Sequence, residues 1–341
     1  MIENTVNVVN LSQFEPEWNW LSRSMPAANR LSWSHSTTQA VSVPGWVPRP
    51  QAWRRAIAAN RAAAAVAPEG SILVSHGPHM TLYGAMALAC RFSDRNHLAY
   101  SFNFTHLPGG TPRRIMSKAF RSVDRFVCFS NMERTLYAHH FDLDIERFDM
   151  IHWAARPPPV DPLAVPVIAG DYICAIGSQG RDYETLIRAM RSLPAVRLAI
   201  VATPESVRGL AIPDNVVLHC NIPLASAMNI LRHSRFMVVP LRDGTVPCGH
   251  VTIVSAMHCA KATIASASSG ISDYIVDASN GFTVPPGDAL SMSRAIDALW
   301  SDPSRASRLG RAAMDFAERY CGEQAAVDYF ERYLKGHAAA V

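Results

Sequence analysis

The stretch 249-GHVTIVSAMHCAKATIASASSGISDYI-275 reads as a turn, a helix, a short strand and a glycine loop, in that order. Gly249 suits a tight turn, and the residues after it repeat apolar side chains at helical spacing. The run ATIAS at 262–266 has the length and content of a buried strand. A helix that begins at such a turn presents free N–H groups and the positive end of its dipole, which attract phosphate. The stretch therefore predicts a parallel-sheet domain with an anion site at a helix start.

The same alternation of strands and helices extends from residue 71 to 141 and again from residue 171 to 319. Such alternation indicates β-α-β units and parallel sheets. Residues 5–70 are less regular, with loops rich in Trp, Ser and Pro. The expected strands are 5–12, 29–34, 71–77, 97–104, 125–130, 171–177, 196–203, 215–220, 235–241 and 262–266, and the expected helices are 49–67, 81–92, 112–122, 131–141, 182–193, 223–233, 250–259, 288–300 and 303–319.

The run 156-RPPPVDPLAVP-166 separates the two series, because its crowded prolines can neither continue a helix nor enter a central strand. A length of 341 residues also suits two domains. We expect an α/β fold of two Rossmann-like parallel-sheet domains that face a central cleft. The expected division is an N-terminal domain at 1–155, a linker at 156–166, a C-terminal domain at 167–322 and a last helix at 323–341 that crosses back to the first domain.

Composition and charge exclude several classes of protein. With 49% hydrophobic and 18% charged residues, and no apolar run of about 18 residues, the chain does not have the sequence of an integral membrane protein. Its start, MIENTVNVVNLS, lacks the regions of a signal peptide, so we expect a cytoplasmic location. The net charge of +4 suits an anionic small ligand or an anionic membrane surface better than nucleic acid. The seven cysteines occur singly, which predicts reduced core residues and neither a zinc site nor disulfides.

A first candidate anion loop is 177-GSQGRDYETLIRAM-190, where Gly177 and Gly180 allow a close turn. Asp182 is placed to cap the following helix, and Arg181 offers a bidentate fork for phosphate. Ser178 lies in the same turn. A GxxG pair alone favours an ordinary strand-to-helix turn with a solvated arginine, and the second loop shifts the interpretation toward an anion site.

The second candidate loop is 243-DGTVPCGHVTIVSAM-257, in which Gly249 leaves the N–H groups of His250, Val251 and Thr252 open at a helix start. The alternatives are a surface histidine and a threonine hydroxyl bonded to its own backbone. We expect the helix to be buried against the sheet through four small or branched side chains. These are Val251, Val254, Ala256 and Ala260.

Three segments between residues 171 and 320 together resemble the GT-B glycosyltransferases, specifically the nucleotide-sugar-dependent group that includes phosphatidylinositol mannosyltransferases and sucrose synthases. IGSQGRDYETLIRAM looks like the first phosphate loop of that group. SAMHCAKATIASASSGISDYI resembles its pattern EAMACGKPVIAS…GG…E, and NGFTVPPGDALSMSRAIDALWSDPSRASRLGRAA resembles its ending. The resemblance implies a nucleotide diphosphate sugar as donor substrate, with no cofactor and no metal.

The sequence departs from this group at one pair of positions. The group carries Glu-x7-Glu for the donor sugar and the ribose, and those positions fall on Pro247 and Ser255. The remaining donor contacts would be made by the helix start and Arg181, with Lys261 read as a helix-end charge. Asp273 could replace the ribose carboxylate, or it could be an ordinary loop residue. The expected donor residues are Ser178, Arg181, Gly249, His250, Val251, Thr252 and Ser255.

The resemblance assigns the acceptor to the first domain, where two strands end in candidate loops. The loop 75-SHGPHMTLYGA-85 contains His76 and His79, and the loop 101-SFNFTHLPGG-110 contains Asn103 and His106. By its place after the strand, His106 resembles the histidine that many members use near the reacting centre, and the ordinary pKa of histidine suits a general base. We expect His106 to be catalytic and His76, His79 and Asn103 to lie on the acceptor side. Because the chain has thirteen histidines, each could also lie at a strand end by chance.

The segment 112-PRRIMSKAFRSVDR-125 predicts a basic amphipathic helix that could lie on an anionic membrane. The alternative is a solvated face over a buried stripe. Its expected basic residues are Arg113, Arg114, Lys118, Arg121 and Arg125, and its expected apolar residues are Ile115, Met116, Ala119 and Phe120. Elsewhere in this domain we expect Tyr137, Phe141 and Trp153 to be structural core residues.

These observations favour a cytoplasmic glycosyltransferase, associated with the inner face of the membrane, that moves a hexose-type sugar to a lipid-linked saccharide in surface-polysaccharide or glycolipid assembly. Two alternatives remain open. The chain could be a nucleotide-sugar epimerase, or a non-catalytic partner that only binds sugar nucleotide or saccharide.

Overall fold

The computed structural model describes residues 5–14, 20–25, 31–66, 70–91, 96–157, 165–242 and 247–338. The chain divides into two compact units. The first unit comprises Met1–Ile151 and Ala326–Val341, and the second unit comprises His152–Ala325. The sequence placed the end of the first domain at residue 155 instead, and most of the expected linker, residues 158–164, lies outside the described residues.

The first unit is built on a six-stranded parallel sheet with the order β2-β1-β3-β4-β5-β6. Its inner strands have buried central residues, as in sheets covered on both faces, whereas the edge strands β2 and β6 are only partly buried. They are β1 (Val6–Ser12), β2 (Leu31–Thr37), β3 (Ile72–His76), β4 (Asn96–Tyr100), β5 (Arg125–Cys128) and β6 (Phe148–Met150).

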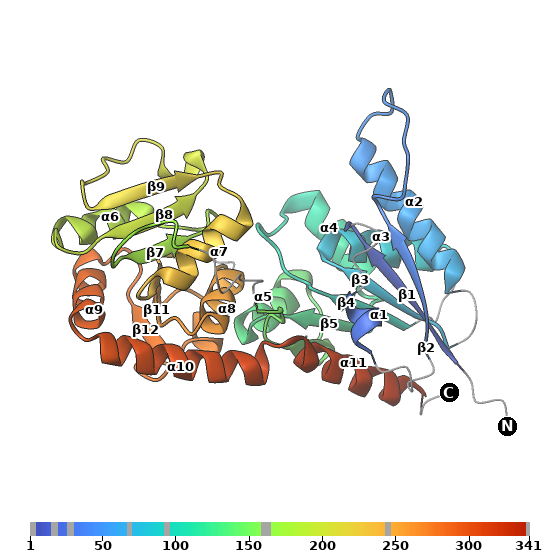
Figure 1. The fold of residues 1–341 in the computed structure, drawn as a ribbon. Coiled ribbons are helices and arrows are strands. Elements are labelled where there is room, and N and C mark those ends of the chain that lie inside the picture. The colour runs from blue at the N-terminus through green and yellow to red at the C-terminus, as the bar shows by residue number, and fades with distance from the viewer. Residues whose placement is uncertain are drawn as a thin grey trace. The chain divides into compact units, whose positions relative to one another are not determined.

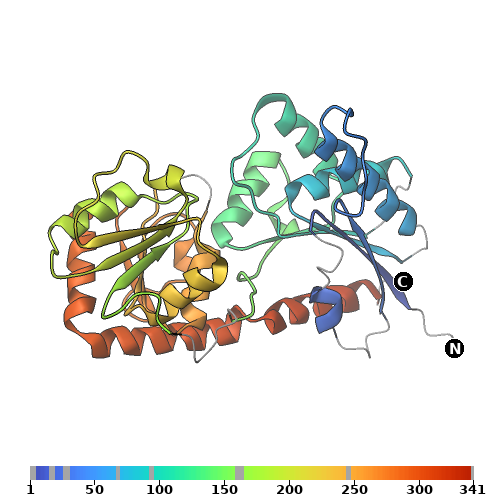
Figure 2. The same cartoon turned by 45° about the horizontal axis from the view of Figure 1, so that its top comes forward.

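Helices cover both faces of this sheet, as Figure 2 shows for the first unit. Helices α2 to α5 pack on one face and α1 and α11 on the other, because alternate strand residues point to opposite sides. The helices are α1 (Trp20–Ser24), α2 (Pro50–Ala65), α3 (Pro78–Ala89), α4 (Gly110–Phe120), α5 (Asn131–Phe141) and α11 (Glu323–Ala338), with a 3-10 turn η2 (Ile145–Arg147) before β6.

The second unit repeats this architecture, with the strand order β12-β11-β10-β7-β8-β9 in a parallel sheet (Figure 1). Its strands are β7 (Ile173–Ile176), β8 (Leu198–Ala202), β9 (Val216–Cys220), β10 (Met237–Val239), β11 (Thr263–Ser266) and β12 (Gly281–Val284). Its helices are α6 (Tyr183–Arg191), α7 (Leu224–His233), α8 (His250–His258), α9 (Ala289–Ser301) and α10 (Pro303–Tyr320), with 3-10 turns η3 (Pro204–Val207) and η4 (Ile271–Asp273).

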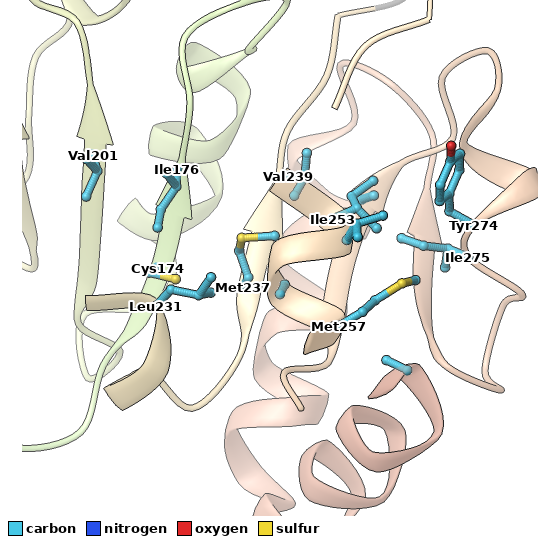
Figure 3. Close-up of a cluster of buried hydrophobic side chains, with 14 of the residues drawn as sticks. Cys174, Ile176, Val201, Leu231, Met237, Val239, Ile253, Met257, Tyr274 and Ile275 are labelled. Atoms are coloured by element: carbon cyan, nitrogen blue, oxygen red, sulfur yellow. The ribbon is translucent and has the colours of Figure 1, made fainter. Parts of the chain in front are cut away.

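Helix α8 lies in the core of the second unit (Figure 3). Its side chains Ile253 and Met257 are fully buried beside Met237 and Val239 of β10. Burying each side chain of this size stabilises the folded state by about 1.5–3 kcal/mol. The core therefore fixes the direction in which α8 begins, at the carboxyl end of β10.

The expected α/β class is confirmed, and the expected helix at 131–141 coincides with α5. The sequence missed β12, whose four residues fall inside a segment dominated by turn residues. Strand β6 ends at Met150, and residues 151–157 continue toward the linker without regular structure. Trp153 donates its backbone N–H to the Tyr274 hydroxyl of the second unit, at 2.9 Å.

Several expected side-chain positions were wrong. Val251 is half exposed, because the buried face of α8 consists of Ile253, Val254, Ala256 and Met257. Arg125 lies at the start of β5 and not on α4, and Ile115 is exposed. The cysteines are free, but Cys90 and Cys220 are exposed and are therefore not core residues.

Tyr137 and Phe141 are fully buried, as expected for core residues, and Trp153 is partly buried. Among the described residues, no helix combines the length and the apolar character needed to cross a bilayer.

Gly310 allows α10 to approach the end of α8 closely. A Cβ atom at this position would overlap the backbone carbonyl of Ala260, which cannot move aside as a flexible side chain could. We expect Gly310→Ala to lower the free energy of unfolding of the full chain by about 1–3 kcal/mol, as overpacking does elsewhere. Gly322→Ala is the matched control, because the nearest atom to its new Cβ would be 3.6 Å away. Urea unfolding compares the two variants, and equal stabilities would contradict the close contact.

Candidate functional site

In the second unit the two candidate loops follow adjacent strands. The first leaves the carboxyl end of β7 and the second leaves that of β10, and these strands pair in the sheet. Carboxyl ends of neighbouring parallel strands are where α/β sheets bind ligands. The backbone also joins the loops, since Arg242 donates its N–H to the Gly180 carbonyl at 2.9 Å.

Two glycines of the first loop are needed for the close approach of neighbouring side chains. Gly177 has φ of 114°, and a Cβ there would lie 2.6 Å from Nη2 of Arg181. Gly180 has φ of 67°, and a Cβ there would overlap the sulfur of Cys248. Both positions therefore need glycine for their backbone angle and for the space it leaves.

Arg181 connects the two loops through its guanidinium, which is only 6% exposed. Its Nε and Nη2 donate to the Ile176 carbonyl at 3.2 and 3.1 Å, and Nη1 donates to the Gln179 carbonyl at 3.1 Å. Nη2 also donates to Oγ1 of Thr252, at the start of α8, at 2.9 Å. The expected bidentate fork for phosphate is thus already occupied by a backbone carbonyl. One of the five guanidinium N–H groups, on Nη1, has no acceptor among the described residues.

The charge of Arg181 has no carboxylate partner among the described residues, since all the acceptors named above are neutral oxygens. Burial lowers the pKa of this guanidinium, but arginine stays protonated in proteins. A buried cation that lacks an anion is costly, and a bound anion would offset that cost. The alternative of a solvated arginine is therefore excluded, because Arg181 is a buried cation whose charge an anion could balance.

The start of α8 adds backbone donors to this charge. Gly249 is the N-cap, with φ of 99°, and its carbonyl accepts the N–H groups of both Thr252 and Ile253. The N–H of Thr252 was expected to be open and is not. The N–H groups of His250 and Val251 have no acceptor among the described residues, so two donors remain at the positive end of the helix dipole.

His250 is buried, which contradicts the alternative of a surface histidine. Its ring stacks on Tyr274 at 5.3 Å, and its Nδ1 is buried with no partner among the described residues. Burial lowers the pKa of His250 to about 4, and the nearby carboxylate of Asp273 only partly opposes this. His250 is therefore neutral at pH 7 and adds polar groups, but no charge, to the helix start.

The other expected donor residues have local structural partners. The hydroxyl of Ser178 accepts the N–H of Thr203 at 2.9 Å, and that of Ser255 donates to the Val251 carbonyl at 2.8 Å. Lys261 donates to the Ser234 carbonyl at 2.6 Å and lies beyond the end of α8.

At the positions where the related group carries glutamates, Pro247 is buried and Ser255 is turned to its own helix. Asp273, the candidate replacement, lies in η4, where its backbone carbonyl accepts a hydrogen bond from Nε2 of His152 at 2.8 Å.

In the first unit the candidate loops also follow paired strands, since His76 at the end of β3 pairs with Tyr100 at the end of β4. His76 is 3% exposed and donates Nε2–H to Oδ1 of Asn10 at 2.5 Å. Burial lowers its pKa to about 3. His76 was expected on the acceptor surface, but its ring lies inside the unit and can only support the loop from behind. His79 is exposed, on the first turn of α3.

In the loop after β4, buried and exposed side chains alternate, so that polar residues reach the surface. Phe102 and Phe104 point into an aromatic cluster with Tyr137, while Asn103 and His106 are exposed. The phenylalanines therefore determine which side chains reach the surface.

A buried carboxyl fixes this loop. Glu133 accepts the Tyr137 hydroxyl at 3.0 Å, and that hydroxyl accepts the N–H of Phe104 at 3.0 Å. Glu133 also accepts the N–H of Phe129 and the hydroxyl of Ser130, the N-cap of α5. Burial raises the pKa of Glu133 to about 7, against the effect of these hydrogen bonds.

Sequence reasoning missed several residues of these sites. The S-x-x-E pattern at Ser130 and Glu133 is a capping box and could have been recognised. Tyr183, whose hydroxyl donates to the Gly177 carbonyl, and Tyr274 give no such signal, since their partners are distant or are backbone groups. Their roles depend on the tertiary structure.

Comparison with known proteins agrees with this geometry. Residues 170–302 match the model of the family described as Glycosyl transferases group 1. Among curated proteins, none matches the chain significantly.

Solved structures match over nearly the whole chain. Sucrose-phosphate synthase from Thermosynechococcus elongatus is 17% identical with a TM-score of 0.73, and the match covers 98% of this chain and 100% of that one. HepE from Anabaena in complex with UDP-glucose is 15% identical with a TM-score of 0.71, over 98% and 100% of the two chains. A glycosyltransferase from Rickettsia africae is 13% identical with a TM-score of 0.69, over 98% and 99%.

The fold is therefore that of the GT-B glycosyltransferases, and the family match lies on the unit that contains Arg181 and α8. The comparisons support a glycosyltransferase of the GT-B type.

The bond between Arg181 and Thr252 can be tested by removing one hydroxyl. Thr252→Val keeps the shape of the side chain but leaves a buried guanidinium N–H without its acceptor. We expect the free energy of unfolding of the full chain to fall by about 1–3 kcal/mol. Thr252→Ser keeps a hydroxyl and should lose less than half as much. If urea unfolding gives both variants the stability of the parent, this contact does not connect the loops.

Glu133 predicts a pH dependence of stability. Its pKa of about 7 in the folded protein lies above its usual 4.5, so the folded state binds more protons than the unfolded chain between these values. The free energy of unfolding should fall by up to about 3 kcal/mol as pH rises from 4.5 to 7, and then level off.

Glu133→Gln should remove this part of the pH dependence, whereas Glu146→Gln, at an exposed position, should keep it. The measurement is urea unfolding of each variant across this pH range. A parent and a Glu133→Gln variant with the same slope would show that the carboxyl is not responsible.

Proposed function

We propose that this protein is a glycosyltransferase that moves a hexose-type sugar from a nucleoside diphosphate to a saccharide acceptor. The observation that carries the proposal is the buried guanidinium of Arg181, without a described carboxylate partner, beside the open N–H groups of α8. The family match over this unit supports the reaction class. Because HepE of the same fold is described in complex with UDP and with UDP-glucose, uridine diphosphate is the nucleotide we propose first.

The donor residues would act on the diphosphate in two ways. The N–H groups of His250 and Val251 and the free N–H of Arg181 would bind phosphate oxygens directly. The charge of Arg181 and the dipole of α8 would stabilise the leaving nucleotide as negative charge develops on it. In this proposal no metal ion is needed, because a fixed cation and oriented donors already meet the phosphates.

The acceptor would be bound by the first unit, at the carboxyl ends of β3 and β4. His106 is exposed there and is the proposed general base, with His79 and Asn103 as acceptor contacts. His76 is inside the unit and would support the loop through Asn10. As a base, His106 would suit an inverting displacement, and as a positioning group a retaining one.

We further propose a lipid-linked acceptor and a role in surface-polysaccharide or glycolipid assembly at the cytoplasmic face of a membrane. Helix α4 supports the membrane contact, since Arg113, Arg114 and Lys118 are exposed on it while Met116 and Phe120 are buried beneath. Asp142, paired with Arg121 at 3.5 Å, offsets only part of this charge.

The second candidate function is a non-catalytic protein that binds sugar nucleotide. The buried Pro247 and the internally bonded Ser255 favour it, because neither position offers a carboxylate to the donor sugar or the ribose. An epimerase has less support, since the described residues show no carboxylate pair at the donor site.

Donor binding is tested by titrating the purified protein with UDP, GDP, ADP, TDP and CMP in a calorimeter. Val251→Pro removes one open N–H at a first-turn position where proline is tolerated, and Val251→Ala is its control. We expect one nucleoside diphosphate to bind the parent and its affinity to fall about tenfold in Val251→Pro, as for one lost charge-assisted hydrogen bond. Arg181→Lys should weaken binding further, since lysine lacks the planar fork that bonds to both loops. Arg197→Ala should not weaken binding, because Arg197 is exposed and lies just before the amino end of β8.

The same proteins separate an enzyme from a binding protein. His106→Ala should keep donor affinity and lose about 100-fold or more of the transfer rate if His106 is the base. Donor binding without hydrolysis or transfer in the parent would favour the non-catalytic function. The absence of binding by every nucleotide would contradict the proposed donor site.

A further inference from the structure

Two exposed tryptophans mark the connection between β2 and α2 in the first unit. Trp46 is 83% exposed and Trp53, on the first turn of α2, is 53% exposed. Indole side chains normally bury much of their surface, and an unburied one often marks an interaction site. Figure 1 shows this connection as a loop that projects beyond the start of α2.

The loop is attached firmly at its base and is stiff at its tip. Val41 is buried, Val43 packs on the same cluster, and Thr38 donates its N–H to the Ser12 carbonyl at 3.1 Å. At the tip, Val47 donates its N–H to the Pro44 carbonyl at 3.1 Å, which closes a turn around Trp46. Prolines at three positions of the loop and helix start restrict it further. These are Pro44, Pro48 and Pro50.

The side chains of the tip are apolar. The neighbours of Trp46 along the loop are Pro44, Gly45, Val47 and Pro48, none of which offers a polar side chain. A saccharide site usually combines an aromatic ring with several convergent polar groups. A rigid apolar tip with tryptophan at its end instead suits insertion into the interface of a lipid bilayer.

The excess positive charge of the chain lies in the segment that includes this tip. Residues 31–123 contain ten Lys and Arg and only two Asp and Glu, whereas the rest of the chain contains 22 and 26. Both acids of this segment, Glu69 and Asp94, lie outside the described residues. The segment forms α2, α3 and α4, consecutive helices on one face of the sheet, with α2 in contact with α3 and α3 with α4 (Figure 2).

Basic residues occupy both ends of this helix layer. Arg49 is exposed just before α2, whereas Arg54 and Arg55 on its first turns are half-buried. Arg55 donates Nε–H and Nη2–H to Oε1 of Gln13. The exposed basic residues of α4 lie at the other end, and its Ile115 is exposed beside them. Basic residues near an anionic bilayer strengthen binding to its headgroups.

We infer that residues 43–53 form a membrane-insertion tip, in which Trp46 and Trp53 enter the interface of an anionic phospholipid bilayer while the basic helices α2 and α4 bind its headgroups. The inference deepens the proposed function, because it gives that transferase access to an acceptor in the bilayer. The tip also lies near the proposed acceptor side. Helix α2, at whose start Trp53 lies, packs against α3, which carries His79 on its first turn.

The test is cosedimentation of the full chain with vesicles of phosphatidylcholine, with and without phosphatidylglycerol. We expect binding to the anionic vesicles that weakens as salt is added. Trp46→Ala with Trp53→Ala should lower the partition coefficient at least about tenfold. Trp46→Phe should lose less, because it keeps an apolar ring. Leu224→Ala, at a 73% exposed apolar position on α7 of the second unit, should have no effect.

Three results would overturn the inference. These are equal binding to neutral vesicles, unchanged binding by the double tryptophan variant, and no binding by the parent. Loss of saccharide transfer in that variant with unchanged vesicle binding would make Trp46 a saccharide contact, and a Trp46-dependent dimer without vesicle binding would make the tip a self-association surface. The assay contains neither donor nor acceptor. A lack of vesicle binding would therefore not contradict the proposed transferase activity, and a lack of transferase activity would not contradict membrane insertion by the tip.

Discussion

The structure of the proposed donor site depends on one buried cation. Arg181 holds the Ile176 and Gln179 carbonyls of its own loop and the Thr252 hydroxyl of α8, so a single guanidinium fixes the carboxyl ends of β7 and β10 relative to each other. Gly177 is required because any side chain there would occupy the space of this guanidinium. The same arrangement leaves the positive charge without an anion among the described residues. A phosphate group would supply that anion, and this is the physical basis of the proposed function.

The acceptor side is organised differently, by an apolar cluster and a buried carboxyl. Phe102 and Phe104 enter the aromatic core, so the residues between and after them are presented at the surface. Tyr137 and Glu133 then satisfy the backbone where the loop leaves the strand. In the first unit, the packing of the phenylalanines thus determines which side chains are exposed. In the second unit, the buried guanidinium of Arg181 instead holds the start of α8 and its N–H groups in place.

Much of this could be predicted from the sequence, because it depends on local patterns. Periodicity located α5 and most of the strands, and Asp182 caps α6 as its type and place suggest. The GT-B resemblance pointed to two loops, which the structure places after the paired strands β7 and β10. Predictions that required tertiary structure were wrong. Val251 was assigned to the buried face of α8, although α8 turns Ile253 and Met257 inward instead.

The role of Arg181 was also only half predicted. The sequence indicated a positive charge in the loop after β7 and assigned its fork to phosphate, whereas the Ile176 carbonyl occupies that fork. No sequence pattern reveals such a contact, since its acceptor is a backbone group that every residue carries. The sequence also does not reveal that His76 and His250 are buried, because the histidine itself is the same whether other elements cover it or not.

The most direct test of the central claim is a double-mutant cycle on UDP affinity. Calorimetry would give the Kd of the parent, Arg181→Gln, Thr252→Val and the double variant. If Arg181 acts by joining the two loops, Thr252→Val should matter only while the guanidinium is present, with a coupling free energy of at least about 1 kcal/mol. Additive losses, or one Kd for all four proteins, would show that the buried cation does not organise a diphosphate site.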